Sequence, residues 1–266
     1  MSAIPDEAPE GAKPTRSVAL RWLKRAALAV SGAVVLSAAA FVAWGLTPLG
    51  PSTVAMKALS PGDGVEVSEK PWGLSFSPSE GEAKAGLVLY PGGRVDFRSY
   101  APLARDVARQ GYLVAIVRVP LSLAILDQGA ADAPLDEAAA LPWAVGGHSL
   151  GGVAAADFAA RDDRVDGLLL LASYPIVDLS DSELFVIDVT ASRDGVLDQA
   201  NWNAAYAKLP RDTARIVVDG GNHAQFGSYG EQPGDTPATV SEADQRGAVA
   251  DVAAQMLARL AEQEAK

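Results

Sequence analysis

The chain has 266 residues, a length that suits one globular domain with an additional N-terminal segment. Its net charge of −11, with no basic stripe beyond the first 25 residues, argues against a nucleic-acid partner. The chain has no cysteine, which excludes disulfides, thiolate nucleophiles and cysteine-based zinc sites. Two histidines, His148 and His223, are too few for a histidine-rich metal centre, so we expect neither a metal nor a cofactor.

The N-terminal segment is predicted to lie at a membrane. Residues 1–25 combine a Pro-, Ala- and acid-rich stretch with a basic cluster, and we interpret them as a disordered, basic cytoplasmic tail. Residues 26–46 then carry no charge, and as a helix they would span a hydrocarbon core of roughly 30 Å. Trp22 and Trp44 flank this run as interfacial aromatics do, and Pro48 follows it.

Three interpretations of this apolar run remain open. Its length and the extended basic region before it favour an uncleaved anchor, whereas Ala38-Ala39-Ala40 offers a cleavage site for a signal peptide. The third alternative is a helix buried in the protein. The positive-inside rule keeps the basic end in the cytoplasm, which places the folded domain, residues 53–266, on the extracytoplasmic side or in secreted form.

The folded domain shows strand-like and helix-like segments in alternation. We expect strands at residues 65–69, 72–77, 86–90, 112–119, 143–146, 167–172, 184–190 and 215–218. Helical spacing predicts helices at residues 100–108, closed by Gly111, within 121–140, and at 150–160, 201–208 and 249–260. This order predicts an α/β fold whose central sheet is mostly parallel and covered by helices on both faces.

The segment Gly147-His148-Ser149-Leu150-Gly151 matches the pattern G-x-S-x-G between an expected strand and an expected helix. A strand that turns sharply into a helix forces the serine into a strained backbone conformation and exposes its hydroxyl. Side chains two positions away on either side would collide with the turn, so glycine is needed there. Ser149 is therefore predicted to be a nucleophile, although a plain glycine-rich turn would give the same letters.

A serine nucleophile needs a base and an acid. His223 lies in a loop after the last expected strand and can reach the same sheet edge as Ser149, whereas the His148 side chain should point away from the serine. The acid is expected between the serine and the histidine in chain order, at a strand end. Asp194 fits best; Asp178 is the second choice, and Asp188 lies inside a strand.

An oxyanion hole requires two backbone N–H groups near the serine. One should come from Leu150, directly after the nucleophile. The other should come from the loop Pro91-Gly92-Gly93, which follows a buried strand and allows close backbone approach. Gly93 is the predicted donor and Arg94 the alternative.

From about Gly86 to its end, the chain resembles the α/β-hydrolase superfamily. The resemblance rests on Tyr90-Pro91-Gly92-Gly93-Arg94, Gly147-His148-Ser149-Leu150-Gly151-Gly152, Arg193-Asp194-Gly195 and Gly221-Asn222-His223. It is similar to the compact, lidless branch that includes dienelactone hydrolase-like proteins. Two features differ: Pro91-Gly92 replaces the usual His-Gly, and a serine replaces the cysteine of dienelactone hydrolases. The resemblance implies a triad of Ser149, Asp194 and His223.

Together these features predict a membrane-attached serine hydrolase acting on a small-molecule ester through an acyl-enzyme. A serine peptidase or amidase would use the same triad. An alternative of another class is a catalytically silent binding domain tethered to the membrane. The oligomeric state does not follow from the sequence.

Overall fold

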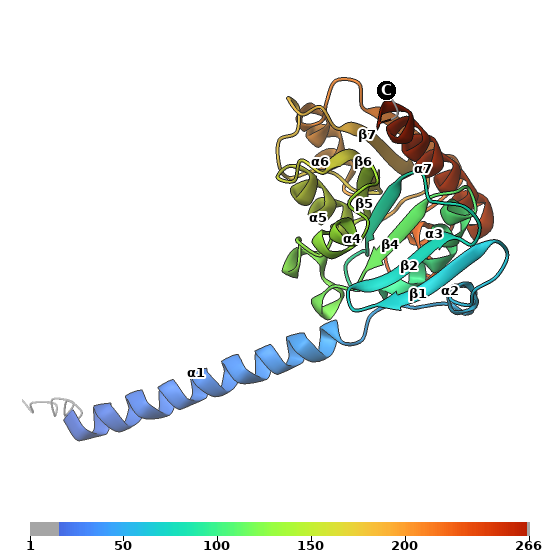
Figure 1. The fold of residues 1–266 in the computed structure, drawn as a ribbon. Helices are drawn as coiled ribbons and strands as arrows, with labels where there is room; N and C mark the ends of the chain where they lie inside the picture. The colour runs from blue at the N-terminus through green and yellow to red at the C-terminus, as the bar shows by residue number, and fades with distance from the viewer. Residues whose placement is uncertain (1–15, 265–266) are drawn as a thin grey trace, which may run out of the picture. The chain divides into compact units, whose positions relative to one another are not determined.

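The computed structural model describes residues 16–264, and the N-terminal tail expected over residues 1–15 lies outside them. The described chain divides into two units, one ending at Trp44 and one beginning at Gly45. Figure 1 shows the elements of both.

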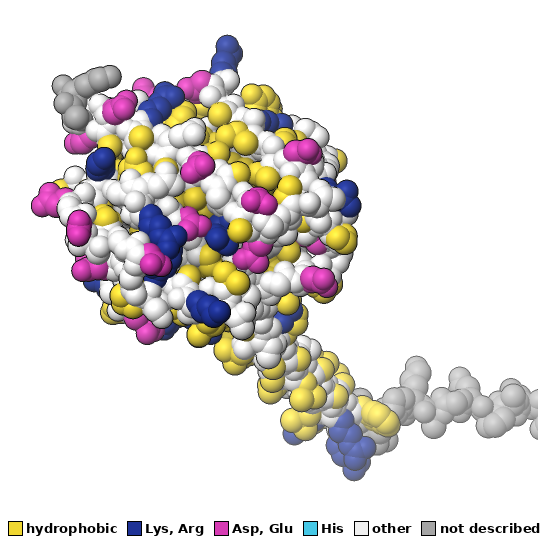
Figure 2. All heavy atoms as spheres, turned by 90° about the vertical axis from the view of Figure 1, so that its right-hand side faces the viewer, with side chains coloured by type: hydrophobic (Ala, Val, Ile, Leu, Met, Phe, Trp, Pro, Cys, Tyr) yellow, Lys and Arg dark blue, Asp and Glu magenta, His cyan; other side chains and the backbone are white. Residues whose placement is uncertain are grey.

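Within the described residues, the first unit is helix α1 (Arg16–Gly45) up to Trp44. The helix begins ten residues before the apolar run, so the basic part of the expected disordered tail, residues 16–25, is helical. Its segment Leu20–Gly45 has a mean hydropathy of 2.2 over its most apolar stretch, and none of that stretch is buried. In Figure 2 hydrophobic side chains line α1, with Lys and Arg grouped toward its N-terminal end. By length and composition, this helix is able to cross a membrane.

The second unit is built on one eight-stranded sheet in the order β1-β2-β4-β3-β5-β6-β7-β8. Its first two strands pair antiparallel, and β2 is also antiparallel to β4; every later pair is parallel. The strands are β1 (Val65–Lys70), β2 (Gly73–Pro78), β3 (Gly86–Tyr90), β4 (Leu113–Val117), β5 (Trp143–His148), β6 (Val165–Leu171), β7 (Phe185–Ala191) and β8 (Ala214–Val218). The predicted mostly parallel sheet is confirmed.

Alternate side chains of the strands enter two separate apolar cores. Leu87 and Leu89 of β3 face the core formed with α3 (Ala101–Ala108) and α7 (Glu242–Glu264). Val88 of the same strand faces the core formed with α5 (Leu150–Ala159). Because successive strand residues point to opposite faces, a run that is apolar at every position is covered on both sides. Figure 1 shows α3 and α7 on one face and α5 on the other.

Several helices differ from their sequence-based predictions. The region 121–140 contains only α4 (Asp132–Glu137), preceded by 3-10 turns at Pro120–Ser122 and Ala124–Leu126. Leu121 and Ser122 have positive φ angles, so a continuous helix cannot form there.

The remaining boundaries also shift. Helix α2 (Thr53–Ala58), capped by the Ser52 hydroxyl, was not predicted, and α6 (Gln199–Ala205) ends before the 3-10 turn Tyr206–Lys208. The closing helix α7 begins seven residues earlier than expected, at Glu242. Helix α3 ends before Gly111, which provides the left-handed turn into β4.

Candidate active site

Ser149 sits in a sharp turn between β5 and α5, with φ +53° and ψ −121°. A non-glycine residue with this positive φ is strained, and such strain is typical of functional sites. A Cβ atom at Gly147 would lie 2.3 Å from the backbone carbon of Gly151, and one at Gly151 would lie 2.3 Å from the carbonyl oxygen of Tyr90. The two glycines are therefore required by close backbone contacts, as the sequence pattern predicts.

The candidate acid and base are joined by a buried hydrogen bond. Asp194 follows β7 and His223 follows β8, and the Nδ1 atom of His223 lies 2.8 Å from the Oδ2 atom of Asp194. The two side chains are only 2% and 0% exposed. Since the ionised carboxylate can only accept, His223 donates from Nδ1, and in its neutral form Nε2 is available to accept a proton.

The second carboxylate oxygen of Asp194, Oδ1, accepts the backbone N–H groups of Val196 and Leu197 at 2.9 and 2.8 Å. Burial raises the pKa of Asp194, but the hydrogen bond and charge of His223 and these two N–H groups outweigh burial and lower it. Asp194 is therefore an anion that holds the imidazole in one tautomer.

The other candidates lie elsewhere. Asp178 has an exposed carboxylate that caps the N–H of Ser180. Asp188 lies within β7, where burial raises its pKa to about 6; Trp202 and Arg215 donate to its Oδ2 atom. Neither carboxylate accepts the Nδ1 proton of His223, so only the first choice of acid pairs with the imidazole.

Ser149 and His223 line the same cavity, whose volume is about 230 Å³. The Ser149 hydroxyl makes no hydrogen bond to another residue within the described range 16–264; catalytic hydrogen bonds often tighten only when a substrate binds. The rest of the cavity wall is mostly apolar and comprises Leu150, Val153, Ala172, Ser173, Tyr174, Val196, Leu197 and Asp198.

The three backbone N–H groups of the loop Gly92-Gly93-Arg94 differ in whether they already donate a hydrogen bond. Gly92 donates its N–H to the Tyr100 hydroxyl at 2.9 Å, and Arg94 donates its N–H to the Ser122 carbonyl at 2.7 Å. Between them, the N–H of Gly93 has no partner within residues 16–264. Gly93 packs on Leu150, because a Cβ atom built on the glycine would lie 3.2 Å from the Cδ2 atom of the leucine. Of the two sequence candidates, Gly93 therefore has the available donor, and Arg94 does not.

Two polar residues that the sequence reasoning missed hold the acid and base loops. Asp235 accepts the N–H of Gly195 at 3.0 Å and the N–H of Ala224 at 2.8 Å, so it joins the two loops. Gln245 of α7, which is fully buried, binds both the N–H and the carbonyl of Asn222. The only sequence signal was an amide one turn before the apolar stripe of α7, and nothing in the sequence marked Asp235.

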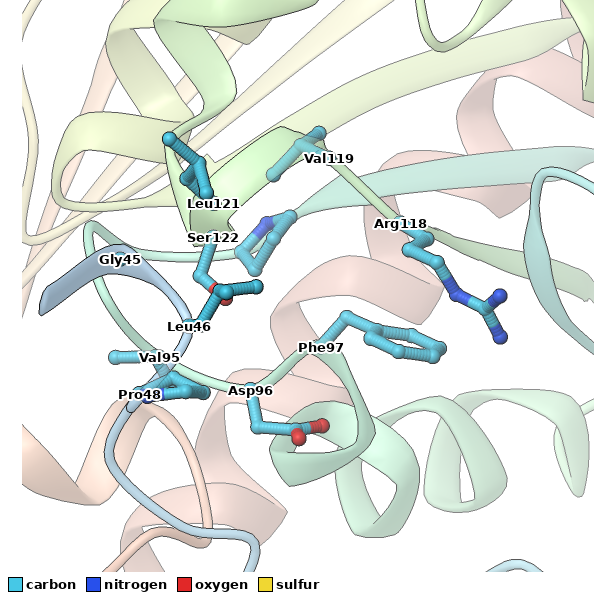
Figure 3. Close-up of a pocket in the computed structure, with 11 residues that line it drawn as sticks. Gly45, Leu46, Pro48, Val95, Asp96, Phe97, Arg118, Val119, Leu121 and Ser122 are labelled. Carbon is cyan, nitrogen blue, oxygen red and sulfur yellow. The ribbon is translucent and has the colours of Figure 1, made fainter. Parts of the chain in front are cut away.

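A second cavity, of about 210 Å³, lies beside Pro91 and Val95 (Figure 3). The charged side chains in its wall are already paired. Asp96 accepts the guanidinium and backbone N–H of Arg98, and Arg118 is ion-paired with Glu69. The Arg118 guanidinium also lies over the Phe97 ring, 4.9 Å from its centre. No histidine lines this cavity, whereas His223 lines the cavity at Ser149.

A mostly parallel sheet with a strained serine at the end of one strand, and with a hydrogen-bonded aspartate and histidine after two later strands, is the arrangement found in α/β hydrolases. The chain belongs to the alpha/beta hydrolase family, whose sequence model matches residues 86–247. No curated protein sequence matches the chain. This match confirms the resemblance of the sequence to the α/β-hydrolase superfamily.

Solved structures of low sequence identity share the fold. A Thermus thermophilus protein matches with a TM-score of 0.55 and 17% identity over 74% of this chain and 98% of its own. The esterase domain of a Rhodothermus marinus protein matches with a TM-score of 0.54 and 14% identity, over 73% of this chain and 97% of its own. An esterase of Pyrobaculum calidifontis matches with a TM-score of 0.54 and 18% identity, over 82% of this chain and 91% of its own. At these identities the likeness concerns the fold alone.

Proposed function

We propose that the chain is a serine hydrolase that cleaves small carboxylic esters through an acyl-enzyme, with Ser149 as nucleophile, His223 as base and Asp194 as the acid that orients it. The observation that carries the proposal is the buried 2.8 Å Asp194–His223 hydrogen bond in the wall of the cavity that also contains the strained Ser149. Two of the proteins that share the fold are themselves described as esterases.

In the proposed reaction, Nε2 of His223 takes the proton of Ser149 as the oxygen attacks the ester carbonyl. The N–H groups of Gly93 and Leu150 bind the oxyanion, and the positive end of α5 adds to this stabilisation. His223 then protonates the leaving alcohol. Water hydrolyses the acyl-enzyme with the same imidazole as base, and Asp194 stabilises the imidazolium in both halves.

The cavity also sets the expected size of the substrate. At about 230 Å³ it is smaller than the 300 to 1,000 Å³ typical of sites for drug-sized ligands. Its largely apolar wall suits a short acyl or alcohol group. We expect p-nitrophenyl acetate and butyrate to be cleaved with higher kcat/KM than decanoate or longer esters.

Labelling with a fluorophosphonate tests the nucleophile. Wild-type protein should be labelled, Ser149→Ala should not, and His223→Ala should lose most of its reactivity. Ser182→Ala is the control, because that hydroxyl only bonds the Leu179 carbonyl outside the cavity. Failure to label the wild-type protein would support the silent binding domain, and faster cleavage of aminoacyl p-nitroanilides than of esters would support a peptidase.

We also propose that α1 anchors the hydrolase in a membrane, with the hydrolase domain on the extracytoplasmic side. The proposal is supported by the uncovered apolar stretch and by the basic residues Arg21, Lys24 and Arg25 that precede it. Because the chain has no cysteine, a single cysteine at the exposed Ser79 can be probed in intact cells. An impermeant maleimide should label Ser79→Cys and not Ser2→Cys; the reverse pattern would invert the topology. Cleavage near Ala40, detected by mass, would show a signal peptide.

A further inference from the structure

His148 is a second imidazole at the candidate active site, and the proposed reaction gives it no task. It ends β5, directly before the nucleophile, and is 1% exposed. Its ring centre lies 4.5 Å from that of His223 and 5.7 Å from that of Phe226. A polar ring is therefore buried where the nucleophile turn and the base loop meet.

The directions of the hydrogen bonds around His148 can be assigned. The Tyr100 hydroxyl accepts the N–H of Gly92, so its single proton is free to go to the Nδ1 atom of His148, 2.8 Å away. Nδ1 is then an acceptor, and the neutral ring carries its proton on Nε2. Burial of Tyr100 raises the pKa of its hydroxyl, so the donor keeps its proton at neutral pH.

The charge state of His148 follows from its surroundings. Burial lowers the pKa of His148 well below 6.5, and the neighbouring His223 lowers it further; the nearby backbone of His223 offsets part of this. The ring therefore remains neutral in the pH range in which the hydrolase would work. It can accept the tyrosine proton throughout that range without adding a positive charge beside the catalytic imidazole.

The same hydrogen bonds fix the loop that carries the candidate oxyanion donor. The N–H of Gly92 is held by Tyr100, and the carbonyl of Gly92 accepts the N–H of Val95 at 3.0 Å. This carbonyl belongs to the same peptide group as the N–H of Gly93, which must point the opposite way. A Cβ atom at Gly92 would lie 2.8 Å from Nδ1 of His148, so only glycine allows this approach.

We propose that Tyr100 and His148 are positioning residues for the oxyanion hole. This inference rests on the proposed function. The two residues hold the N–H of Gly92, so that the next N–H, that of Gly93, stays directed toward the space beside Ser149. Neither residue lines the cavity at Ser149. They link the oxyanion loop to the nucleophile turn through two buried hydrogen bonds, and their contribution is therefore made in the transition state, where the oxyanion forms.

Tyr100→Phe in the full-length protein tests this directly, because it keeps the ring and removes only the hydroxyl. Deleting an oxyanion donor costs about 100- to 1,000-fold in kcat, and a misaimed donor should cost about 10- to 100-fold. KM should change less than about threefold. Inhibition by a boronic acid, which forms a tetrahedral adduct with the serine, should weaken with kcat/KM. Tyr112→Phe, at a buried tyrosine directly before β4, is the matched control.

Two further variants separate positioning from packing. His148→Asn places an amide oxygen near the position of Nδ1 and should retain most activity, whereas His148→Leu removes the acceptor and should match Tyr100→Phe. The double variant Tyr100→Phe/His148→Leu should be no worse than either single one, since both break the same link. Thermal unfolding of each variant checks that the fold is retained.

The outcomes are distinguishable. If wild-type protein hydrolyses esters and Tyr100→Phe keeps kcat within threefold, the positioning role is wrong and the proposed function stands. The positioning role is also wrong if His148→Asn is no more active than His148→Leu, or if Tyr100→Phe binds the boronic acid with wild-type affinity. If the wild-type protein neither hydrolyses esters nor reacts with a fluorophosphonate, the proposed function fails and the inference fails with it.

Discussion

Replacing Asp194 with asparagine should inactivate the proposed hydrolase while leaving its site intact in shape. The Oδ1 atom of Asp194 accepts two backbone N–H groups, from Val196 and Leu197, so the amide oxygen of an asparagine must take that place. Its NH₂ group then faces Nδ1 of His223, so a donor takes the place of the acceptor that lies 2.8 Å from Nδ1 in the wild-type protein. The imidazole is forced into the tautomer with the proton on Nε2, which cannot accept the proton of Ser149.

The expected size of the effect follows from this tautomer change. Loss of the correct tautomer in a serine triad lowers kcat by about 10⁴-fold, which corresponds to about 5 kcal/mol in the activation free energy. KM for p-nitrophenyl butyrate should change little, because the cavity wall is unaltered. Stopped-time ester hydrolysis and fluorophosphonate labelling both measure the loss. Asp178→Asn, at an exposed carboxylate, is the control. Retention of more than a tenth of wild-type kcat in Asp194→Asn would refute the assignment.

Three further predictions concern stability and loop placement, all measured on detergent-solubilised full-length protein. Gly151→Ala should destabilise the fold by about 3 kcal/mol or more, because its Cβ would lie 2.3 Å from a carbonyl oxygen. Gly247→Ala should instead stabilise α7 by about 1 kcal/mol, because nothing lies within 4 Å of the added Cβ. Melting temperatures equal to that of the wild type would contradict both. Because burial raises the pKa of Asp188 from 3.8 to about 6, the folded protein binds this proton more tightly than the unfolded chain. The unfolding free energy of wild type relative to Asp188→Asn should therefore fall by up to about 3 kcal/mol as pH rises from about 4 to about 7, and a rise would show the sign to be wrong. Asp235→Ala should lower kcat about 10- to 100-fold by releasing the acid and base loops from each other, and unchanged kinetics would show that the loops hold without it.

The sheet was predictable from the sequence because its strands are marked by local composition. Runs such as Gly86–Tyr90 are apolar at every position, which only a strand covered on both faces tolerates, and the structure has β3 at those residues. Helix ends were less predictable. The region 121–140 has helix-forming composition, but positive φ angles at Leu121 and Ser122 interrupt it. The second of these residues accepts the N–H of Arg94, a contact between distant segments that no local pattern reveals.

For the candidate site, the sequence by itself determined the glycine-flanked turn at Ser149 and limited a histidine base to two imidazoles, because backbone strain demands glycine and the chain has two histidines. It could only rank three carboxylates as the acid and two N–H groups as the oxyanion donor. The tertiary structure favours one candidate of each kind for the proposed site: Asp194 alone of the three carboxylates bonds to His223, and Arg94, unlike Gly93, has its backbone N–H already in a hydrogen bond. Hydrogen bonds between loops far apart in the chain depend on how the sheet brings them together, and that arrangement is not written in any short segment.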